Sequence, residues 1–249
     1  PQIAWTQSAD TLLVTHPEVE ARRITRAGLG SWTVDTWPFA KSGSLRLYPF
    51  YKFADTAVAL TPSATTGAIT LNASADVFDA SHAGQNWRVA GKQVQITAVT
   101  SSTTADATVL EDLPGIEPTP DFEEPAFSAL RGWPVTVAFH QDRLVIGGSR
   151  DLPNRLWLSK AGDLFNFDLG EGLDDEAIEF PILSDQVNAI RGVFSGRHLQ
   201  VFTSGAEWMV TGDPLTPTSV QARRQTRIGS VVDRYVPPKN VDGATLFVG

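Results

Sequence analysis

The chain has 249 residues, of which 42% are hydrophobic, and its formal net charge is −8. This length and apolar content allow one large packed domain or two smaller ones, and they exclude a wholly disordered chain. The acidic balance argues against a general nucleic-acid-binding surface, because phosphate contacts need clustered lysine and arginine. Cysteine is absent, which excludes disulfides, thiol catalysis and thiolate metal sites.

Targeting segments are not visible in this sequence. It contains no run of 18 apolar residues, so we expect no membrane span. The chain begins with Pro1, and no charged stretch followed by an apolar one marks a signal peptide. The last residues, 244–249, have the pattern of a strand at the edge of an incomplete sheet. We therefore expect the chain to be part of a longer protein.

The N-terminal part has the pattern of short strands joined by polar turns. Residues 2–7 alternate between apolar and polar side chains, and strand-like runs follow at 12–16, 22–26 and 31–34. This series predicts a four-stranded antiparallel meander. Residues 37–55 are rich in aromatic side chains and proline without a clean period, so we expect an ordered connector there.

Composition shifts at Thr56 towards alanine, threonine and serine. The following apolar runs are short and separated by polar turns, which is typical of a small β-barrel or sandwich. Strands are expected at 68–71, 87–89, 94–99 and 107–110, with a helical turn or loop at 78–84. The next stretch combines proline with acidic residues and predicts an exposed linker.

The C-terminal half repeats a plan of strand, polar turn and strand. In the first copy Val135, Val137 and Phe139 alternate, the polar turn 140–143 follows, and further strands are expected at 144–148 and 156–158. A second copy aligns Phe194 with Phe139 at a spacing of 55 residues, and a third begins at Val241 after a further 47. Repeats of this length with three or four strands each indicate β-propeller blades.

The predicted fold class is therefore all-β, with β-propeller-like blades built from antiparallel meanders and a small inserted β-barrel or sandwich domain. Residues 1–57 are expected to hold one or more blades and the connector, 58–112 the inserted β domain, 113–131 the linker rich in proline and acidic residues, and 132–249 further blades. Two packed β-sandwiches are the alternative all-β arrangement.

The densest charge in the chain lies after the 156–158 strand. Oxygen-rich loops of this kind can bind calcium, although the spacing is not that of a twelve-residue calcium loop. Paired carboxylates could also serve glycoside hydrolysis. A solvated acidic loop is the simpler interpretation. The candidate subunit-contact or channel-lining residues here are Asp163, Asp168, Glu171, Asp174, Asp175 and Glu176.

Two basic clusters stand out in this acidic protein, Arg22, Arg23 and Arg26 near the start and Arg223, Arg224 and Arg227 near the end. They could pair with the acidic loop of a neighbouring subunit. Ordinary salt bridges on the surface are the alternative. The second cluster is therefore also a candidate for subunit contact or channel lining.

No catalytic, cofactor or metal-ligating motif is found. The four histidines are scattered, the Ser-Gly pairs lack the Gly-x-Ser-x-Gly frame, and no phosphate-binding glycine pattern occurs. We expect no catalytic residue, no cofactor and no metal. Trp5, Trp157 and Trp208 lie within expected strands, so we expect them to pack in the core.

Several motifs resemble the tail nozzle family of short-tailed bacteriophages, also called tail tubular protein B. The resemblance is sharpest over 132–210 and extends to the N-terminal meander. The motifs are GWP at 132–134, AFHQDRL at 138–144, GG at 147–148, WLSK at 157–160, GDLFNF at 162–167, DQVNAI at 185–190, TSGAEW at 203–208, QSAD at 7–10, LVTHP at 13–17 and RITR at 23–26.

This resemblance implies a structural protein of the virion tail, assembled in the host cytoplasm, and not an enzyme. Members of the family form a hexamer of identical subunits, built partly from β-propellers, below the portal and the tail adaptor ring. Double-stranded DNA passes through this conduit without sequence recognition, and the conduit helps to retain packaged DNA. The family has no catalytic residues to carry over. The chain is far shorter than a whole nozzle protein.

A second function class stays open. A carbohydrate-binding or glycoside-hydrolysing β-propeller module of a receptor-binding protein would need an exposed tryptophan beside convergent carboxylates. A nozzle would instead place acidic residues on one lining face and would have large surfaces between subunits. The exposure of Trp37, Trp87 and Trp133 is expected to help separate the two.

Overall fold

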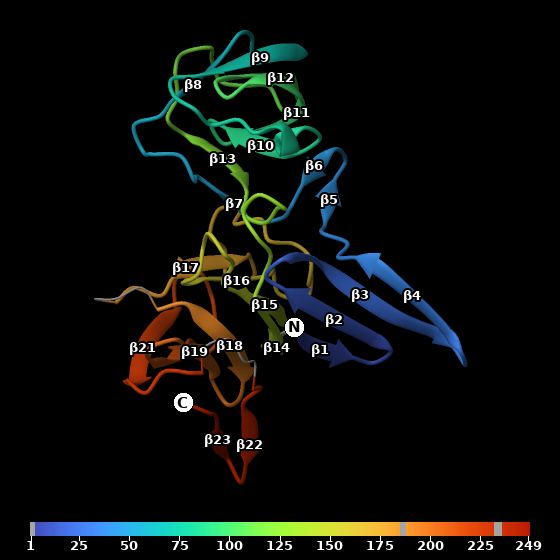
Figure 1. The fold of residues 1–249 in the computed structure, drawn as a ribbon, viewed down its shortest axis with the longest axis vertical. Coiled ribbons are helices and arrows are strands. Elements are labelled where there is room, and N and C mark those ends of the chain that lie inside the picture. Colours follow the sequence, from blue (N-terminus) through green and yellow to red (C-terminus); the bar gives the residue numbers. More distant parts are fainter. Residues whose placement is uncertain (1–2, 185–187, 232–235) are drawn as a thin grey trace. The chain divides into compact units, whose positions relative to one another are not determined.

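The structure is a computed structural model that describes residues 3–184, 188–231 and 236–249 (Figure 1). These residues contain no α-helix, and every strand pair among them is antiparallel, so the predicted all-β class is confirmed. The chain divides into two compact units. Unit 1 comprises Pro1–Ala40 and Phe127–Gly249, and unit 2 comprises Lys41–Ala126. No helix of the described residues is long and apolar enough to cross a membrane.

Unit 1 begins with the predicted four-stranded meander, β1 (Ala4–Ser8), β2 (Thr11–His16), β3 (Val19–Gly28) and β4 (Ser31–Thr36). One face of this sheet buries Ala4, Leu13 and Ala21. The strand register places Trp5 and Trp32 together on the opposite face, where they are 57% and 62% exposed. The expected core position of Trp5 is therefore wrong, because strand alternation sends this side chain to the solvated face of an edge strand.

Two further meanders follow in unit 1, and each keeps its strands in chain order. The second comprises β14 (Thr136–His140), β15 (Arg143–Gly147), β16 (Arg155–Leu158) and β17 (Ile178–Pro181). The third comprises β18 (Ile190–Ser195), β19 (Leu199–Thr203), β20 (Glu207–Thr211) and β21 (Gln221–Thr226). The two sheets share one hydrophobic core, which includes Val145, Leu158, Val201 and Val210. The hairpin of β22 (Lys239–Val241) and β23 (Ala244–Leu246) completes the unit.

Strand β14 is buried on both faces, which the sequence pattern did not indicate. Thr136, Ala138 and His140 are buried, as is Val137, although the alternating apolar side chains are Val135, Val137 and Phe139. The reason is that β14 packs against β18 on one side and against β1 and β2 on the other. The first strands of the three meanders thus lie next to one another in space.

Unit 2 is a curled sheet of seven strands in the order β7-β13-β10-β11-β12-β9-β8. Its strands are β7 (Phe50–Tyr51), β8 (Leu60–Pro62), β9 (Ala68–Ala73), β10 (Asn86–Val89), β11 (Lys92–Ser101), β12 (Thr104–Val109) and β13 (Phe122–Pro125). Leu60 in edge strand β8 exchanges two backbone hydrogen bonds of 2.9 Å with Thr119, just before β13, so the sheet curls into a half-barrel. The fully buried Trp87 lies in its core.

The flanks of unit 2 differ from the sequence prediction. The predicted linker is wrong over residues 122–127, because β13 is a strand of the sheet and Phe122 and Glu124 are only 3% exposed. Part of the expected connector also belongs to this unit, as the hairpin of β5 (Lys41–Ser42) and β6 (Leu45–Arg46) and as β7. The predicted helical turn at 78–84 is confirmed as the 3-10 helix η1 (Ala80–His82). Its His82 lies 3.2 Å from buried Glu124.

Gln2 of the first expected strand and residues 185–187 of the DQVNAI motif lie outside the described residues.

The position of β13 in the sheet can be tested by truncating Phe122. Phe122→Ala removes a ring that stacks against Trp87 at a centroid distance of 6.3 Å. We expect a loss of about 3–5 kcal/mol in the free energy of unfolding, because a cavity forms in the core. The control is Ile116→Ala in the same predicted linker, where the side chain is 51% exposed. Urea denaturation giving equal losses for the two variants would contradict the assignment.

Candidate functional site

The polar turn between β14 and β15 contains a buried arginine on which the neighbouring loops converge. Arg143 is only 2% exposed. Its guanidinium donates hydrogen bonds to the carbonyl oxygens of Ser159 at 2.7 Å, Glu176 at 2.5 Å and Asp174 at 2.8 Å. Longer contacts reach the carbonyls of Asp175 at 3.4 Å and Leu215 at 3.3 Å. The charge is therefore solvated by backbone dipoles.

The two residues at the tip of the turn connect the second and third meanders. Gln141 and Asp142 both have positive φ, at 46° and 57°, as a two-residue hairpin loop of type I′ requires. The Gln141 carbonyl oxygen Oε1 accepts a hydrogen bond of 2.8 Å from the Leu215 backbone N–H. Gly162 donates to the backbone carbonyl of Asp142 at 2.9 Å. These bonds stabilise a conformation that non-glycine residues rarely adopt.

Burial lowers the pKa of Arg143, while the nearby carboxylate of Asp175 opposes this change. An arginine keeps its charge under such a shift, because the pKa of a guanidinium begins far above neutral pH. The site therefore holds a permanent positive charge inside the protein. This charge fixes the carbonyl oxygens of residues 174–176 and with them one end of the acidic segment.

The acidic loop, residues 163–177 between β16 and β17, is the segment that Arg143 anchors. The carboxylate of Glu176 accepts hydrogen bonds of 2.8 Å from the backbone N–H groups of Glu171 and Leu173, so it stabilises the loop from within. The stretch 163–176 contains six carboxylates and no basic residue. Four of these side chains face solvent: Asp163, Glu171, Asp174 and Asp175.

One carboxylate of the loop has a basic partner outside it. Lys160 Nζ lies 2.9 Å from Asp175 Oδ2. This hydrogen bond lowers the pKa of Asp175 and raises that of Lys160. Asp168 and Glu176 are half-buried. Among the described residues no group of three or more His, Asp or Glu side chains is placed to hold a metal ion, so the calcium interpretation gains no support.

The basic cluster near the end of the chain lies on β21, the last strand of the third meander, and on the residue directly after it. Arg223, Arg224 and Arg227 are all exposed. Arg224 lies over the ring of Trp208 at 5.9 Å. The earlier cluster behaves differently, because Arg22, Arg23 and Arg26 each lie within 4 Å of a carboxylate of their own sheet region. Ordinary surface salt bridges therefore account for the first cluster.

A histidine and a serine meet between the second and third meanders. His140 Nδ1 lies 2.9 Å from Ser195 Oγ, and these two residues are 55 positions apart, the spacing of the sequence repeat. The other ring nitrogen, Nε2, is buried and has no hydrogen-bond partner among the residues that the structure describes. Burial, and secondarily the charge of His198, lowers the pKa of His140. The pair joins equivalent strand ends of β14 and β18.

The tryptophans divide into buried and exposed groups. Trp157 and Trp208 pack in the core as predicted, and Trp37 and Trp87 are also buried. Trp133 is half-buried. Among these, none offers an open stacking face for a sugar ring. The exposed pair is Trp5 and Trp32 on the sheet of β1–β4.

The structure places the predicted acidic residues on one loop, Arg223 and Arg224 on β21 and Arg227 directly after this strand. Arg143, the residue that organises the loop, was assigned only to a polar turn. The signal that could have identified it is an arginine that opens the otherwise apolar strand RLVIG. A charged residue within a buried strand needs several partners, and its position is therefore informative.

Comparison with protein-family models finds no match for this chain, and comparison with curated proteins finds none either.

Replacing the anchor tests its role. Arg143→Met keeps an apolar stem of similar length but leaves the carbonyls of Ser159, Asp174 and Glu176 without their donor. We expect the free energy of unfolding to fall by at least about 3 kcal/mol, because buried polar groups lose their hydrogen bonds. Amide exchange at Glu171 and Leu173 should accelerate. Arg223→Met, at an exposed position, should change stability by less than about 0.5 kcal/mol.

If Arg143→Met and Arg223→Met have the same stability and the same exchange rates in the acidic loop, Arg143 does not anchor that loop.

His140 gives the protein a pH dependence of defined sign. Because the folded-state pKa is lowered, the unfolded chain binds the proton first as the pH falls below the ordinary histidine value of about 6.5. Stability is then lost with decreasing pH, by at most about 1.4 kcal/mol per pH unit from this group. His140→Gln should reduce that slope between pH 7 and pH 5, whereas Ser195→Ala should retain it. Equal slopes in wild type and His140→Gln would contradict the assignment.

Proposed function

We propose that this protein is a structural component of a bacteriophage tail, a nozzle or tail tubular protein that forms part of the DNA-exit conduit and helps to retain packaged DNA. The observation that carries the proposal is the acidic loop, with six carboxylates and no basic residue over 163–176, held in place by the buried Arg143. The motif resemblance includes both the AFHQDRL turn and the GDLFNF start of this loop.

An anchored acidic surface suits a DNA conduit for an electrostatic reason. Like charges repel, so a wall of carboxylates prevents a polyanion from adhering while it moves past. Repulsion of this kind acts over about 8 Å at physiological ionic strength. A flexible acidic segment could turn away or pair with basic side chains. A loop fixed by Arg143 and Glu176 keeps its carboxylates in position.

The arrangement of the meanders supports the blade interpretation. In a β-propeller each blade is a four-stranded antiparallel meander, and the blades surround a common axis. Here three four-stranded meanders keep their strands in chain order, and β14 packs against both β18 and β1. The hydrogen bond between His140 and Ser195 joins equivalent positions of two of them. We propose that they are blades or descendants of blades.

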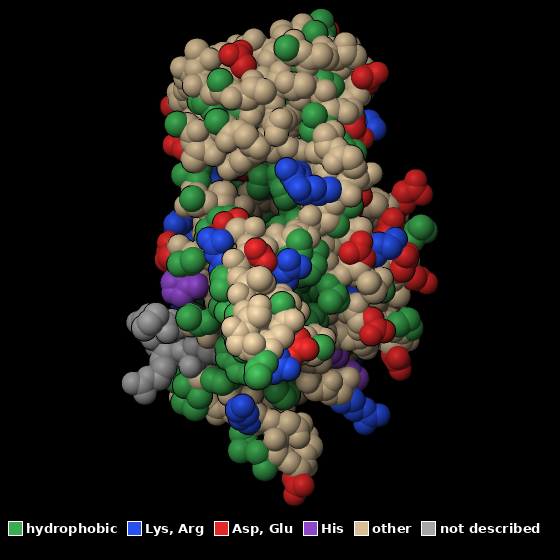
Figure 2. Space-filling model, turned by 90° about the vertical axis from the view of Figure 1, so that its right-hand side faces the viewer, with side chains coloured by type: hydrophobic (Ala, Val, Ile, Leu, Met, Phe, Trp, Pro, Cys, Tyr) green, Lys and Arg blue, Asp and Glu red, His purple; other side chains and the backbone are tan. Residues whose placement is uncertain are grey.

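The proposed role is structural rather than enzymatic. The hydroxyl of Ser195 contacts Nδ1 of His140. Nε2 of this histidine is buried and has no partner in the described part of the chain. A nucleophile of the Ser-His type needs a third group that orients the imidazole. Figure 2 shows basic side chains dispersed among acidic and hydrophobic ones on one side of the molecule, a mixed surface that fits passage of DNA without sequence recognition.

The proposed partners are identical subunits in a hexamer, the tail adaptor and portal rings, and the passing double-stranded DNA, with the protein located in the virion tail after assembly in the host cytoplasm. In a ring, each subunit offers one surface to the neighbour on one side and a different surface to the other. The exposed arginines in and directly after β21, Arg223 and Arg227 above all, have the charge to meet an acidic loop on such a neighbour.

A carbohydrate-binding module of a receptor-binding protein is the second candidate. The observation that favours it is the exposed pair Trp5 and Trp32, which share one face of a sheet with Arg22 and Arg26. Exposed aromatic rings with flanking hydrogen-bond donors can hold sugar rings. In this second candidate the sugar would bind to the face of Trp5 and Trp32, and the acidic loop would have no part in binding.

Electron microscopy of negatively stained protein, alone and mixed with a tail adaptor ring, tests the nozzle proposal. We expect rings or short tubes with sixfold symmetry that seat on the adaptor. A double variant, Arg223→Glu with Arg227→Glu, should weaken ring formation, and Arg22→Glu should serve as a control from the internally paired cluster. A monomer that does not bind the adaptor, and that binds glycans only when Trp5 is present, would contradict the nozzle proposal and support the second candidate.

A further inference from the structure

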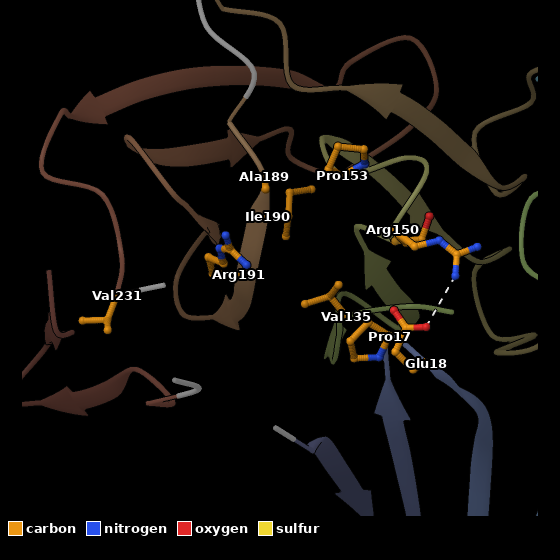
Figure 3. A pocket seen from close by; sticks show the side chains of 10 residues that line it. Pro17, Glu18, Val135, Arg150, Pro153, Ala189, Ile190, Arg191 and Val231 are labelled. Atoms are coloured by element: carbon orange, nitrogen blue, oxygen red, sulfur yellow. Dashed lines mark hydrogen bonds and ion pairs between the residues drawn. The ribbon is translucent and has the colours of Figure 1, made fainter. Parts of the chain in front are cut away.

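A cavity of about 260 Å³ lies within unit 1 where its three meanders approach one another (Figure 3). We call it the junction pocket. Val135 and Ile190 form part of its apolar wall, and Glu18, Ser149, Arg150 and Arg191 contribute its polar groups. The pocket opens to solvent, and a volume of this size is sufficient for a small ion or a small organic acid.

Backbone contacts fix the walls of the junction pocket. The backbone N–H of Trp133 donates to the carbonyl of Pro17 at 2.8 Å, and the N–H of Ile190 donates to the carbonyl of Pro153 at 2.7 Å. Gly132 allows a close approach, because a Cβ at this position would lie 2.9 Å from the Cβ of Arg150. The pocket is therefore formed before any ligand arrives, as in most small-molecule sites.

The two arginines of the pocket differ in their partners. Arg150 pairs with Glu18 at 3.4 Å, as the dashed line in Figure 3 marks, and with Asp151 at 3.0 Å. Asp151 also lies 3.6 Å from Arg131, so two arginines and two carboxylates balance this wall. Arg191 lies on the other side of the pocket. Its Nε atom is buried without a hydrogen-bond partner in the described part of the chain.

The buried Nε–H group of Arg191 has no acceptor among the described residues, and such a group is costly. A buried donor left without an acceptor costs about 1–3 kcal/mol, and more when the group is charged. Apolar neighbours such as Ile190 and Val135 strengthen any electrostatic interaction formed there. An oxyanion would satisfy the guanidinium with two parallel hydrogen bonds. Ser149 adds a hydroxyl whose oxygen already accepts from the Leu152 N–H at 3.0 Å, so its proton is available for donation.

We propose that the junction pocket binds a small oxyanion, a phosphate or a small carboxylic acid, through the guanidinium of Arg191. The Ser149 hydroxyl is the second donor, and the balanced pair of Glu18 and Arg150 forms the opposite wall. Phosphate and carboxylate share the chemistry that a guanidinium recognises, and the pocket volume admits either. This site is independent of the nozzle function and does not use the acidic loop.

Calorimetric titration with inorganic phosphate and, separately, with acetate tests the proposal, with sodium chloride at equal ionic strength as the reference. Three proteins are compared: wild type, Arg191→Met and Arg223→Met. Arg223 is an exposed arginine outside the pocket. We expect saturable binding of at least one anion to wild type, at least about tenfold weaker binding to Arg191→Met, and unchanged binding to Arg223→Met. The anion that binds more tightly shows whether the ligand is a phosphate or a carboxylic acid.

An NMR titration shows directly whether Arg191 contacts the anion. The Nε–H resonance of Arg191 in a nitrogen–proton NMR spectrum should shift during the titration, because its proton gains an acceptor, and the shift should saturate with the calorimetric isotherm. Circular dichroism confirms that Arg191→Met is folded. Absence of saturable binding by both anions would overturn the proposal. Equal binding of the anion by all three proteins would also overturn the proposal, because the binding would then not depend on Arg191.

Discussion

Burying the charge of Arg143 is the constraint on which much of unit 1 depends. Removing a guanidinium from water costs several kcal/mol unless its donors are satisfied. The protein satisfies them with carbonyl oxygens from the end of β16, from the acidic loop and from Leu215 between β20 and β21 of the third meander. Segments that are distant in sequence must therefore converge on one side chain, and their relative positions become fixed.

The anchored loop and the sheet junction are two consequences of the same turn. Arg143 fixes residues 174–176, and Glu176 in turn fixes the backbone of Glu171 and Leu173, so the exposed carboxylates stand on a rigid support. Gln141 and His140, on the other side of the turn, connect to Leu215 and Ser195 of the third meander. A stretch of four residues thus links packing, loop geometry and the charged surface that we associate with function.

Local patterns predicted much of the fold but not its non-local contacts. Alternation and turn residues located most strands of the three meanders, because these signals depend on neighbouring residues. They missed β17, which follows the acidic loop. They failed at Phe122, whose place in a sheet depends on pairing with Arg88 and Val89 far back in the chain. They failed at Trp5 because alternation does not tell which face a second layer covers. Arg143 and Arg191 were missed as sites, since their significance lies in which partners surround them.

The central claim is that the acidic loop lines a DNA conduit in an assembled tail. A cryo-electron microscopy reconstruction of the protein assembled with its tail adaptor ring tests it most directly, by locating residues 163–176 relative to the symmetry axis. The account predicts that Asp163, Glu171 and Asp174 face the lumen and that Arg143 contacts the carbonyls of 174–176 in every subunit. A loop on the outer surface of the ring, away from the lumen, would contradict it.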